Sequence, residues 1–215
     1  RFVNGKCTFE EVDVDLCRKF MEYLLNAPQS IHTSQKLHIN SAAGYWSAFR
    51  AVLHTAYRDR KIKENPNGFL DRIECIPTMR EHLSQEELIR LAETPCEEEV
   101  LKRAFLFGCL TGLRKSDIRQ LTWQQIQPYT NGKMFVTTRM QKTKQIVHNP
   151  ISDEAYRLLG ERHDGLIFDG FKDKMLQGPL KRWLLAAGIT KKITFHCTRH
   201  SFGSLHVEMG TDMAV

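Results

Sequence analysis

A break in helical periodicity near residues 65–82 constrains the fold of this chain more than any other feature. The run Asn65-Pro66-Asn67-Gly68 places proline, which lacks a backbone N–H, close to glycine, and both residues end helices. Pro77 follows, and the apolar spacing of the preceding segment is lost as far as residue 82. The chain is therefore expected to fold as two parts, residues 1–75 and residues 76–215, joined by a linker.

The first part is expected to be helical throughout. Apolar residues recur at helical spacing in residues 9–26 and again in residues 41–63, and the stretch between them is polar. The apolar stripe of the second segment includes Tyr45, Trp46 and Val52, which are predicted to face inward. Its opposite face carries a series of basic side chains.

The second part is expected to be mostly helical with a small antiparallel sheet. Ser84 and Glu87 have the spacing of a capping box, which predicts that a helix begins there. Residues 132–138 and 145–151 are rich in β-branched side chains and partly alternate, which predicts two strands joined by a basic turn, with residues 123–126 as a candidate third strand. Further helices are expected at residues 97–110, 115–121, 152–163, 171–187 and 198–209. The predicted fold class is mainly α with a small antiparallel β-sheet.

The composition excludes several classes of protein. Of the 215 residues, 26% are charged and 41% are apolar, which is ordinary for a globular chain and excludes collagen-like, low-complexity and disordered classes. No apolar run approaches the roughly 20 residues of a membrane span, and no secretory signal opens the chain, so we expect a cytoplasmic protein without a membrane partner. Lys and Arg outnumber Asp and Glu by 31 to 25. This excess favours a polyanionic partner, although charge that only aids solubility would look the same.

The six cysteines do not indicate a metal site. None of them forms a C-x-x-C pair, and Cys109 and Cys197 lie inside apolar stretches. This pattern favours reduced, buried thiols over disulfides. No metal or other cofactor is expected.

An arginine follows a glycine turn at the junction of two predicted helices. Arg114 comes two residues after Gly112, and Asp117 lies three residues further on, where its carboxylate could hold the guanidinium. The planar guanidinium matches the paired oxygens of a phosphate. A helix-capping turn with a surface ion pair is the alternative interpretation.

Two further basic sites could act on an anion. Lys142 lies in the predicted turn between two strands, where a solvated charge is the alternative and the nearby Lys144 leaves the assignment open. His196 and Arg199 are three residues apart and share a face at the start of a helix. Histidine can move protons near neutral pH and arginine can neutralise an anion. A buried histidine beside a structural arginine is the alternative.

Taken together, these sites resemble the tyrosine recombinase (phage-type integrase) family, and the resemblance covers nearly the whole chain. The closest pattern is that of mobile-element integrases. The residues that carry the resemblance are Leu83-Ser84-Gln85-Glu86-Glu87-Leu88, like the opening of the catalytic domain; Thr111 to Ile118 with Leu121-Thr122-Trp123, like the first arginine box; His196-x-x-Arg199-His200-Ser201-Phe202, like the second; and Asn65-Pro66, like the end of the core-binding domain.

The resemblance implies a helical, SAM-like core-binding domain followed by an integrase-like α+β catalytic domain. It implies a site-specific recombinase that cuts and rejoins double-stranded DNA through a 3′-phosphotyrosyl intermediate, as a monomer alone and a tetramer on DNA in synapsis. Arg114 and Arg199 would clamp the non-bridging phosphate oxygens, and Lys142 would protonate the leaving 5′-oxygen. His196 would hydrogen-bond the phosphate or assist proton transfer, and Asp117 would orient Arg114.

The nucleophile of the family has no counterpart in these residues. The resemblance implies a tyrosine roughly two to three dozen residues after the second arginine, but the sequence ends sixteen residues past Arg199 and its last tyrosine is Tyr156. We therefore expect a truncated chain that cannot complete strand cleavage by its own tyrosine, and an incomplete N-terminal domain. A DNA-binding regulator built on the same scaffold, without catalysis, is the alternative function.

Contacts with DNA are expected to be mainly to phosphates, so that affinity falls steeply with salt. For each residue, a solvated charge is the alternative. The candidates are Arg50, Arg58, Arg60, Lys61, Lys63, Lys115, Arg119, Lys144, Lys181 and Arg182.

Overall fold

The structure is a computed structural model that describes residues 2–3, 6–30, 33–128, 132–139, 145–208 and 210. The chain divides into two compact units, unit 1 at Arg1–Thr78 and unit 2 at Met79–Val215. Each unit has a hydrophobic core of its own. The predicted fold class is confirmed, because helices dominate and three strands form one antiparallel sheet.

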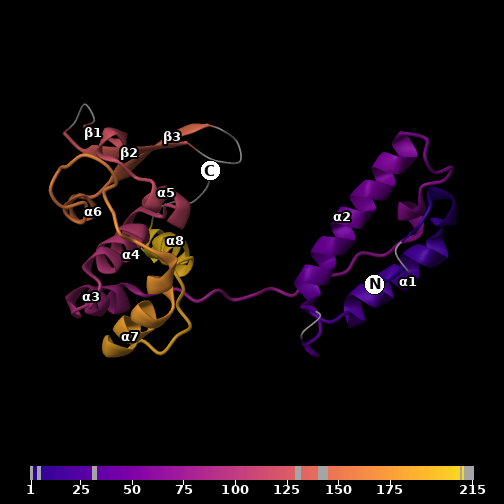
Figure 1. Cartoon of the computed structure of the whole chain (residues 1–215), viewed down its shortest axis with the longest axis horizontal. Helices are drawn as coiled ribbons and strands as arrows, with labels where there is room; N and C mark the ends of the chain where they lie inside the picture. Colours follow the sequence, from indigo (N-terminus) through magenta and orange to yellow (C-terminus); the bar gives the residue numbers. More distant parts are fainter. Residues whose placement is uncertain are drawn as a thin grey trace. The chain divides into compact units, whose positions relative to one another are not determined.

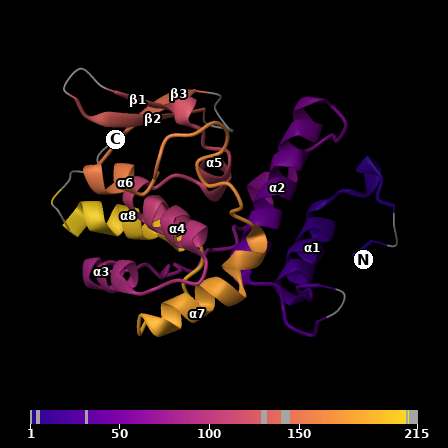
Figure 2. The ribbon, with the colours of Figure 1, turned by 60° about the vertical axis from the view of Figure 1, so that its left-hand side comes forward.

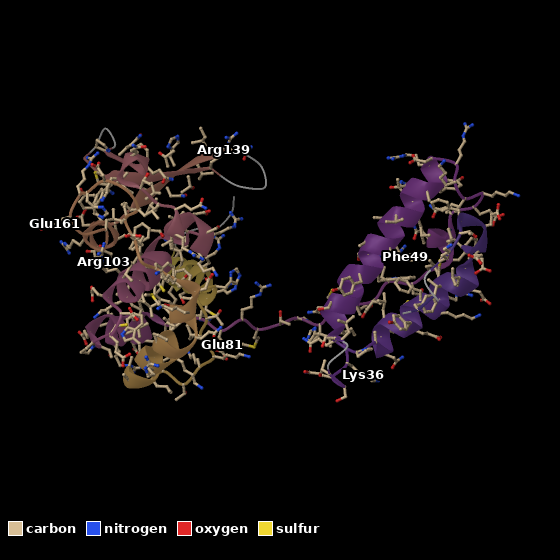
Figure 3. The ribbon with its side chains drawn as sticks, in the orientation of Figure 1. Lys36, Phe49, Glu81, Arg103, Arg139 and Glu161 are labelled. Carbon is tan, nitrogen blue, oxygen red and sulfur yellow. The ribbon has the colours of Figure 1, made fainter. Side chains whose placement is uncertain are left out.

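Unit 1 is built on two helices that pack through aromatic rings. The ring centroids of Phe20 and Phe49 lie 4.8 Å apart, and Phe20 also contacts Trp46. Figure 3 shows Phe49 pointing from the second helix toward the first. Asp13 caps the first helix by accepting a hydrogen bond from the N–H of Leu16 at 2.7 Å. The elements of unit 1 are η1 (Phe9–Glu11), α1 (Val14–Asn26), α2 (Ile39–Arg58) and η2 (Pro66–Phe69).

The long helix predicted for residues 41–63 ends five residues early, at Arg58. Arg60 adopts a left-handed conformation with φ 56°, through which a right-handed helix cannot continue. The N–H of Lys61 then donates to the carbonyl of Ala56 at 2.8 Å, which satisfies a free carbonyl at the end of the helix. Glycine usually occupies such a position, so the sequence did not indicate the turn.

The apolar stripe of α2 is narrower than predicted. Tyr45 and Val52 are 59% and 60% exposed, whereas Trp46 is buried. The indole N–H of Trp46 donates to the carbonyl of Asp71 at 2.9 Å, and Leu70 is buried beside it in the core of unit 1. The first residues of the predicted linker therefore pack against α2.

Unit 2 is arranged around the buried helix α4. Figures 1 and 2 both place the sheet at one end of the unit, α4 and α8 in the middle, and α3 and α7 at the other end. Val136 at the centre of the sheet pairs with Ile126 on one side and Asn149 on the other. The elements are α3 (Gln85–Glu93), α4 (Glu99–Thr111), α5 (Lys115–Arg119), η3 (Trp123–Gln125), β1 (Ile126–Pro128), β2 (Met134–Arg139), β3 (Ile146–Ile151), α6 (Asp153–Arg157), η4 (Asp173–Leu176), α7 (Gly178–Ala186) and α8 (Cys197–Glu208).

Three predicted elements of unit 2 are wrong in extent or type. The candidate strand at residues 123–126 is a 3-10 turn, and the third strand begins only at Ile126. The helix predicted for residues 152–163 stops at Arg157 and is followed by Gly160 at φ 77°. The helix predicted for residues 171–187 begins as a 3-10 turn before α7.

The predicted capping box at the start of α3 is confirmed. The N–H of Glu87 donates to Ser84 Oγ at 3.2 Å, and the N–H of Ser84 donates to Glu87 Oε2 at 2.9 Å. Lys191 Nζ lies 2.7 Å from the same carboxylate oxygen. Burial alone would raise the pKa of Glu87, but the hydrogen bonds from Lys191 and Ser84 hold this pKa below its usual range. The carboxylate therefore joins α3 to the segment before α8.

We expect Arg103→Met to destabilise unit 2 by about 2–3 kcal/mol, because it removes a charged donor from the carbonyls of the half-buried Leu158 and the buried Leu159. The Arg103 guanidinium, labelled in Figure 3, donates to the carbonyls of Leu158 and Leu159 and lies 5.7 Å from the ring centroid of Phe168. Chemical denaturation should show the loss. The control is Arg157→Met, at a side chain that is 75% exposed. Equal stabilities of the two variants would contradict the prediction.

Candidate active site

Two glycines allow α8 to approach α4 closely. A β-carbon at Gly108 would lie 3.0 Å from Thr198 Oγ1, and one at Gly112 would lie 2.5 Å from the ring of Phe202. Thr198 and Ser201 of α8 are fully buried at this contact. The end of α4, where the first arginine box begins, is therefore held against α8, which carries most of the second box. The contact packs glycine backbone against side chains, and larger residues in place of the glycines would prevent it.

Arg114 lies on a backbone that is fixed from both sides. Gly112 ends α4 in the left-handed region, with φ 62°. Leu113 and Ile118 are buried on either side of Arg114. The carbonyl of Arg114 accepts hydrogen bonds from the N–H groups of Asp117 and Ile118, at 2.9 and 3.0 Å, and so begins α5. The Arg114 side chain is exposed and forms no ion pair or hydrogen bond in the described part of the chain.

Arg199 reaches from α8 to the end of α4. Its guanidinium donates a short hydrogen bond to the carbonyl of Gly112, two residues before Arg114. The last carbonyls of a helix lack partners within the helix and carry partial negative charge, so a cation is favoured there. This contact brings together the two arginine boxes, which are 87 residues apart in the sequence.

The two guanidinium groups are close enough to repel each other. Burial lowers the pKa of Arg199, the charge of Arg114 lowers it further, and the carboxylate of Asp117 opposes both effects. Asp117 accepts a hydrogen bond from the hydroxyl of Ser116 at 3.1 Å. Among the described residues no ion pair joins Asp117 to Arg114. The electrostatic effect of the Asp117 carboxylate is instead on the pKa of Arg199. The prediction that Asp117 orients Arg114 stays a prediction.

His196 lies immediately before α8, and its carbonyl accepts a hydrogen bond from the N–H of Arg199 at 3.3 Å. Its exposed ring meets the ring of His200 edge to face, with the centroids 5.1 Å apart. This contact limits the orientations that the His196 ring can adopt. The structure thus brings three of the predicted residues, Arg114, His196 and Arg199, to one region around the start of α8.

Arg80 and His82, in the segment before α3, join this region, and the sequence did not indicate either of them. Arg80 Nη1 lies 3.4 Å from His200 Nε2. The pKa of His200 is lowered, first by burial and then by the charges of His196, Arg80, Arg199 and His82. Arg80 lies in a stretch without periodicity or a recognisable motif, and only tertiary packing places it here.

Lys142 and Lys144 lie outside the described residues. The described parts of β2 and β3 flank their segment, and Figure 3 labels Arg139 at the end of β2. The roles predicted for both lysines stay predictions.

Several of the predicted DNA-contacting residues already have protein partners. Asp173 binds Lys115 Nζ at 2.8 Å and Arg119 Nη1 at 2.9 Å, and these cations hold the pKa of Asp173 below its usual range. Exposed ion pairs of this kind contribute little stability and can exchange for phosphate. The other partnered cations are Arg182 with Glu97, Arg58 with Asp59, and Arg50 with Asn67.

Three of the remaining candidates line one hollow of unit 1. Arg60, Lys61 and Lys63 follow the end of α2, and the hollow has a volume of about 970 Å³. The exposed rings of Phe9 and Phe69 also line it. Lys181 is exposed on α7 in unit 2. Whether these four contact DNA stays a prediction.

The cysteines at the α4–α8 contact are buried thiols. Cys109 of α4 is fully buried, which raises the pKa of its thiol, and the neighbouring Cys197 begins α8. All six cysteines are free, and Cys7 and Cys75 are exposed. Within the described ranges, no three side chains of the metal-binding types gather as a possible metal site. No described helix combines the length and apolar character needed to cross a bilayer.

We expect Gly112→Ala to cost about 2–4 kcal/mol, because it combines backbone strain with a clash against Phe202. The matched control is Gly188→Ala, where φ is 72° and no atom lies within 4 Å of an added β-carbon. That variant should cost only about 1 kcal/mol of strain. Chemical denaturation measures both. The double variant Gly112→Ala with Phe202→Leu should recover part of the loss, and equal costs at the two glycines would refute the packing argument.

We expect His200 to titrate below its ordinary value of 6.5 in the folded chain. Because its folded pKa is the lower one, the unfolded chain binds the proton more readily, and stability falls as pH drops below about 6.5. An NMR titration of the imidazole signals gives the pKa directly. His200→Gln should flatten the loss of stability between about pH 7 and 5. A folded pKa at or above 6.5 would contradict the geometry.

Sequence comparisons match both units. The model described as Phage integrase family matches residues 81–215, and the model described as Phage integrase SAM-like domain matches residues 1–70. Tyrosine recombinase XerD of Proteus mirabilis is 22% identical in an alignment of 199 residues that covers 81% of this chain and 62% of that protein. Tyrosine recombinase XerD of Lacticaseibacillus casei is 25% identical in an alignment of 187 residues that covers 79% of this chain and 64% of that protein. The chain thus spans less than two thirds of either relative.

Solved structures share the fold at low identity. A lambda integrase (75–356) dimer bound to a COC′ core site has a TM-score of 0.65 at 15% identity, over 95% of this chain and 74% of that one. The Tn1549 transposon integrase (aa 82–397) in complex with circular intermediate DNA has a TM-score of 0.63 at 17% identity, over 97% of this chain and 77% of that one. With the family match over most of unit 2 and the arginine boxes in one region, the chain belongs to the phage integrase family, the family of the tyrosine recombinases.

Proposed function

We propose that this chain is the DNA-binding and phosphate-clamping part of a site-specific recombinase that cuts and rejoins double-stranded DNA through a 3′-phosphotyrosyl intermediate. The observation that carries the proposal is the meeting of Arg114, Arg199 and His196 around the α4–α8 junction. Two guanidinium groups that repel each other gain from an anion between them. A phosphodiester supplies that anion, and its oxygens gain negative charge in the transition state.

Each basic group has a distinct proposed task. Arg114 and Arg199 bind the non-bridging oxygens of the phosphate, and their fixed backbones remove the cost of reorganisation during the reaction. His196, with its ring against His200, hydrogen-bonds the phosphate or moves a proton at the attacking oxygen. Lys142 protonates the leaving 5′-oxygen. The attacking hydroxyl belongs to a tyrosine, and because no tyrosine follows Tyr156 in these 215 residues, we propose that it comes from outside them.

We propose that residues 1–75 act as the core-binding domain and residues 76–215 as part of the catalytic domain. The two family matches, at residues 1–70 and 81–215, support this division. The basic side chains beyond the end of α2 and on α5 and α7 would contact phosphates, with four copies assembled on DNA. The six free thiols are consistent with work in the reducing cytoplasm. Integration or excision of a mobile element is the proposed role.

We expect Arg114→Ala to abolish covalent protein–DNA adducts and to leave most duplex binding intact. Arg114 acts on one phosphate, whereas binding is spread over many. The measurement uses the parent protein extended to its natural C-terminus, with its own attachment-site DNA as a nicked suicide substrate, and follows adducts by denaturing gel electrophoresis.

Arg157→Ala is the matched control, since it removes an exposed arginine on α6 to which we assign no part in binding or cleavage. It should form adducts at the unmodified rate. If the unmodified parent protein never forms an adduct, a DNA-binding regulator on the same scaffold replaces the enzyme. Equal loss of adducts and duplex binding in Arg114→Ala would instead make Arg114 a general binding residue.

A further inference from the structure

Arg80 reaches the candidate active site from a segment outside both arginine boxes. It lies in the extended stretch that leads into α3, and Figure 3 labels the next residue, Glu81, where this stretch meets unit 2. Arg80 Nη1 is 3.4 Å from His200 Nε2, and the ring of His200 contacts the ring of His196. The contacts therefore run from Arg80 through His200 to a residue of the proposed phosphate site.

The position of this segment is set by buried contacts. The N–H of Leu83 donates to Ser201 Oγ at 2.8 Å, and both residues are fully buried. The Ser201 hydroxyl in turn donates to the carbonyl of Cys197 at 3.0 Å. The chain is thus anchored to α8 three residues after Arg80, so the reach of the Arg80 side chain is limited to the region around the start of α8.

Arg80 has no acidic partner within ion-pair distance in the described part of the chain. Its side chain is exposed. The groups whose charges act on its partner His200 are His196, Arg199 and His82, besides Arg80 itself, and none of them is acidic. A guanidinium has five N–H donors, and His200 accepts from one of them. The others are available for an anion.

We propose that Arg80 binds a second backbone phosphate of the DNA, adjacent to the phosphate held by Arg114 and Arg199, and that His200 positions it for this contact. The proposal rests on the proposed function, because it needs DNA to lie at the start of α8. His200 accepts from Arg80 only through a neutral ring nitrogen, so its uncharged form holds the guanidinium without competing for the phosphate. Arg80 is therefore a binding residue and His200 a positioning residue.

The test measures how the affinity of the 215-residue chain for a fluorescein-labelled duplex depends on salt, by fluorescence anisotropy near pH 7.5. Between about 50 and 200 mM salt, each phosphate contact adds about 0.9 to the slope of log affinity against log salt. We expect Arg80→Gln to lower this slope by about 0.9 and Arg80→Lys to retain it, since lysine keeps the charge. Arg157→Gln, which removes an exposed arginine on α6, should leave the slope unchanged.

The positioning role has its own readout. His200→Ala removes no charge near pH 7.5, yet we expect it to lower the slope by a similar amount, because Arg80 loses its support. Combining His200→Ala with Arg80→Gln should then cause no further decrease. Far-ultraviolet circular dichroism confirms that each variant is folded. If Arg80→Gln fails to fold, Arg80→Ala replaces it, with the same expected decrease of about 0.9 in the slope.

The outcomes separate this proposal from the proposed function. If Arg114→Ala lowers the slope and Arg80→Gln does not, the phosphate site stands and Arg80 is not part of it. If Arg80→Gln weakens binding with an unchanged slope, Arg80 has a structural role only. If neither variant changes the slope, the DNA does not lie at the start of α8, and both proposals fail.

Discussion

The hydrogen bond from the Arg199 guanidinium to the carbonyl of Gly112 is the contact on which the site depends. It joins the end of α4 to the start of α8, and it uses a carbonyl that the helix itself leaves without a partner. The glycine makes this possible in two ways, because it adopts φ 62° and leaves room for the ring of Phe202. The same turn leads directly into Arg114. One short segment thus ends a helix, receives one arginine and presents the other.

The start of α8 differs from the surface formed by α5 and α7 in its counter-charges. Around the candidate DNA-contacting surface, Asp173 neutralises Lys115 and Arg119, and Glu97 neutralises Arg182. Around the start of α8 the described acidic groups give no ion pair to Arg114 or Arg199, and Asp117 acts on Arg199 only through its field. Basic groups gathered in this way repel one another and so reduce the stability of the folded protein. Such a destabilising arrangement is typical of a functional site. An anion bound as we propose would offset this loss of stability.

The sequence predicted those features that depend on local patterns. The capping box of Ser84, the two main strands and the fold class follow from spacing and residue type, and the structure confirms them. The end of α2 was missed because Arg60 takes a left-handed conformation that no glycine announces. Arg80 was missed because its place beside His200 comes from packing across 120 residues of sequence, which no local pattern records. The resemblance to the family supplied Arg114, His196 and Arg199 as a set, and their roles and that of Lys142 stay proposals.

The burial of Cys109 and Cys197 has a practical consequence for labelling this chain. Thiol-reactive dyes and spin labels attack the thiolate, and burial suppresses that form at Cys109 and raises the pKa of Cys17 to about 11. The exposed thiols, Cys7 and Cys75, both belong to unit 1. Alkylating probes added to the native chain will therefore mark unit 1 first. They leave the α4–α8 junction chemically intact, so that unit 1 can be followed by fluorescence or electron paramagnetic resonance.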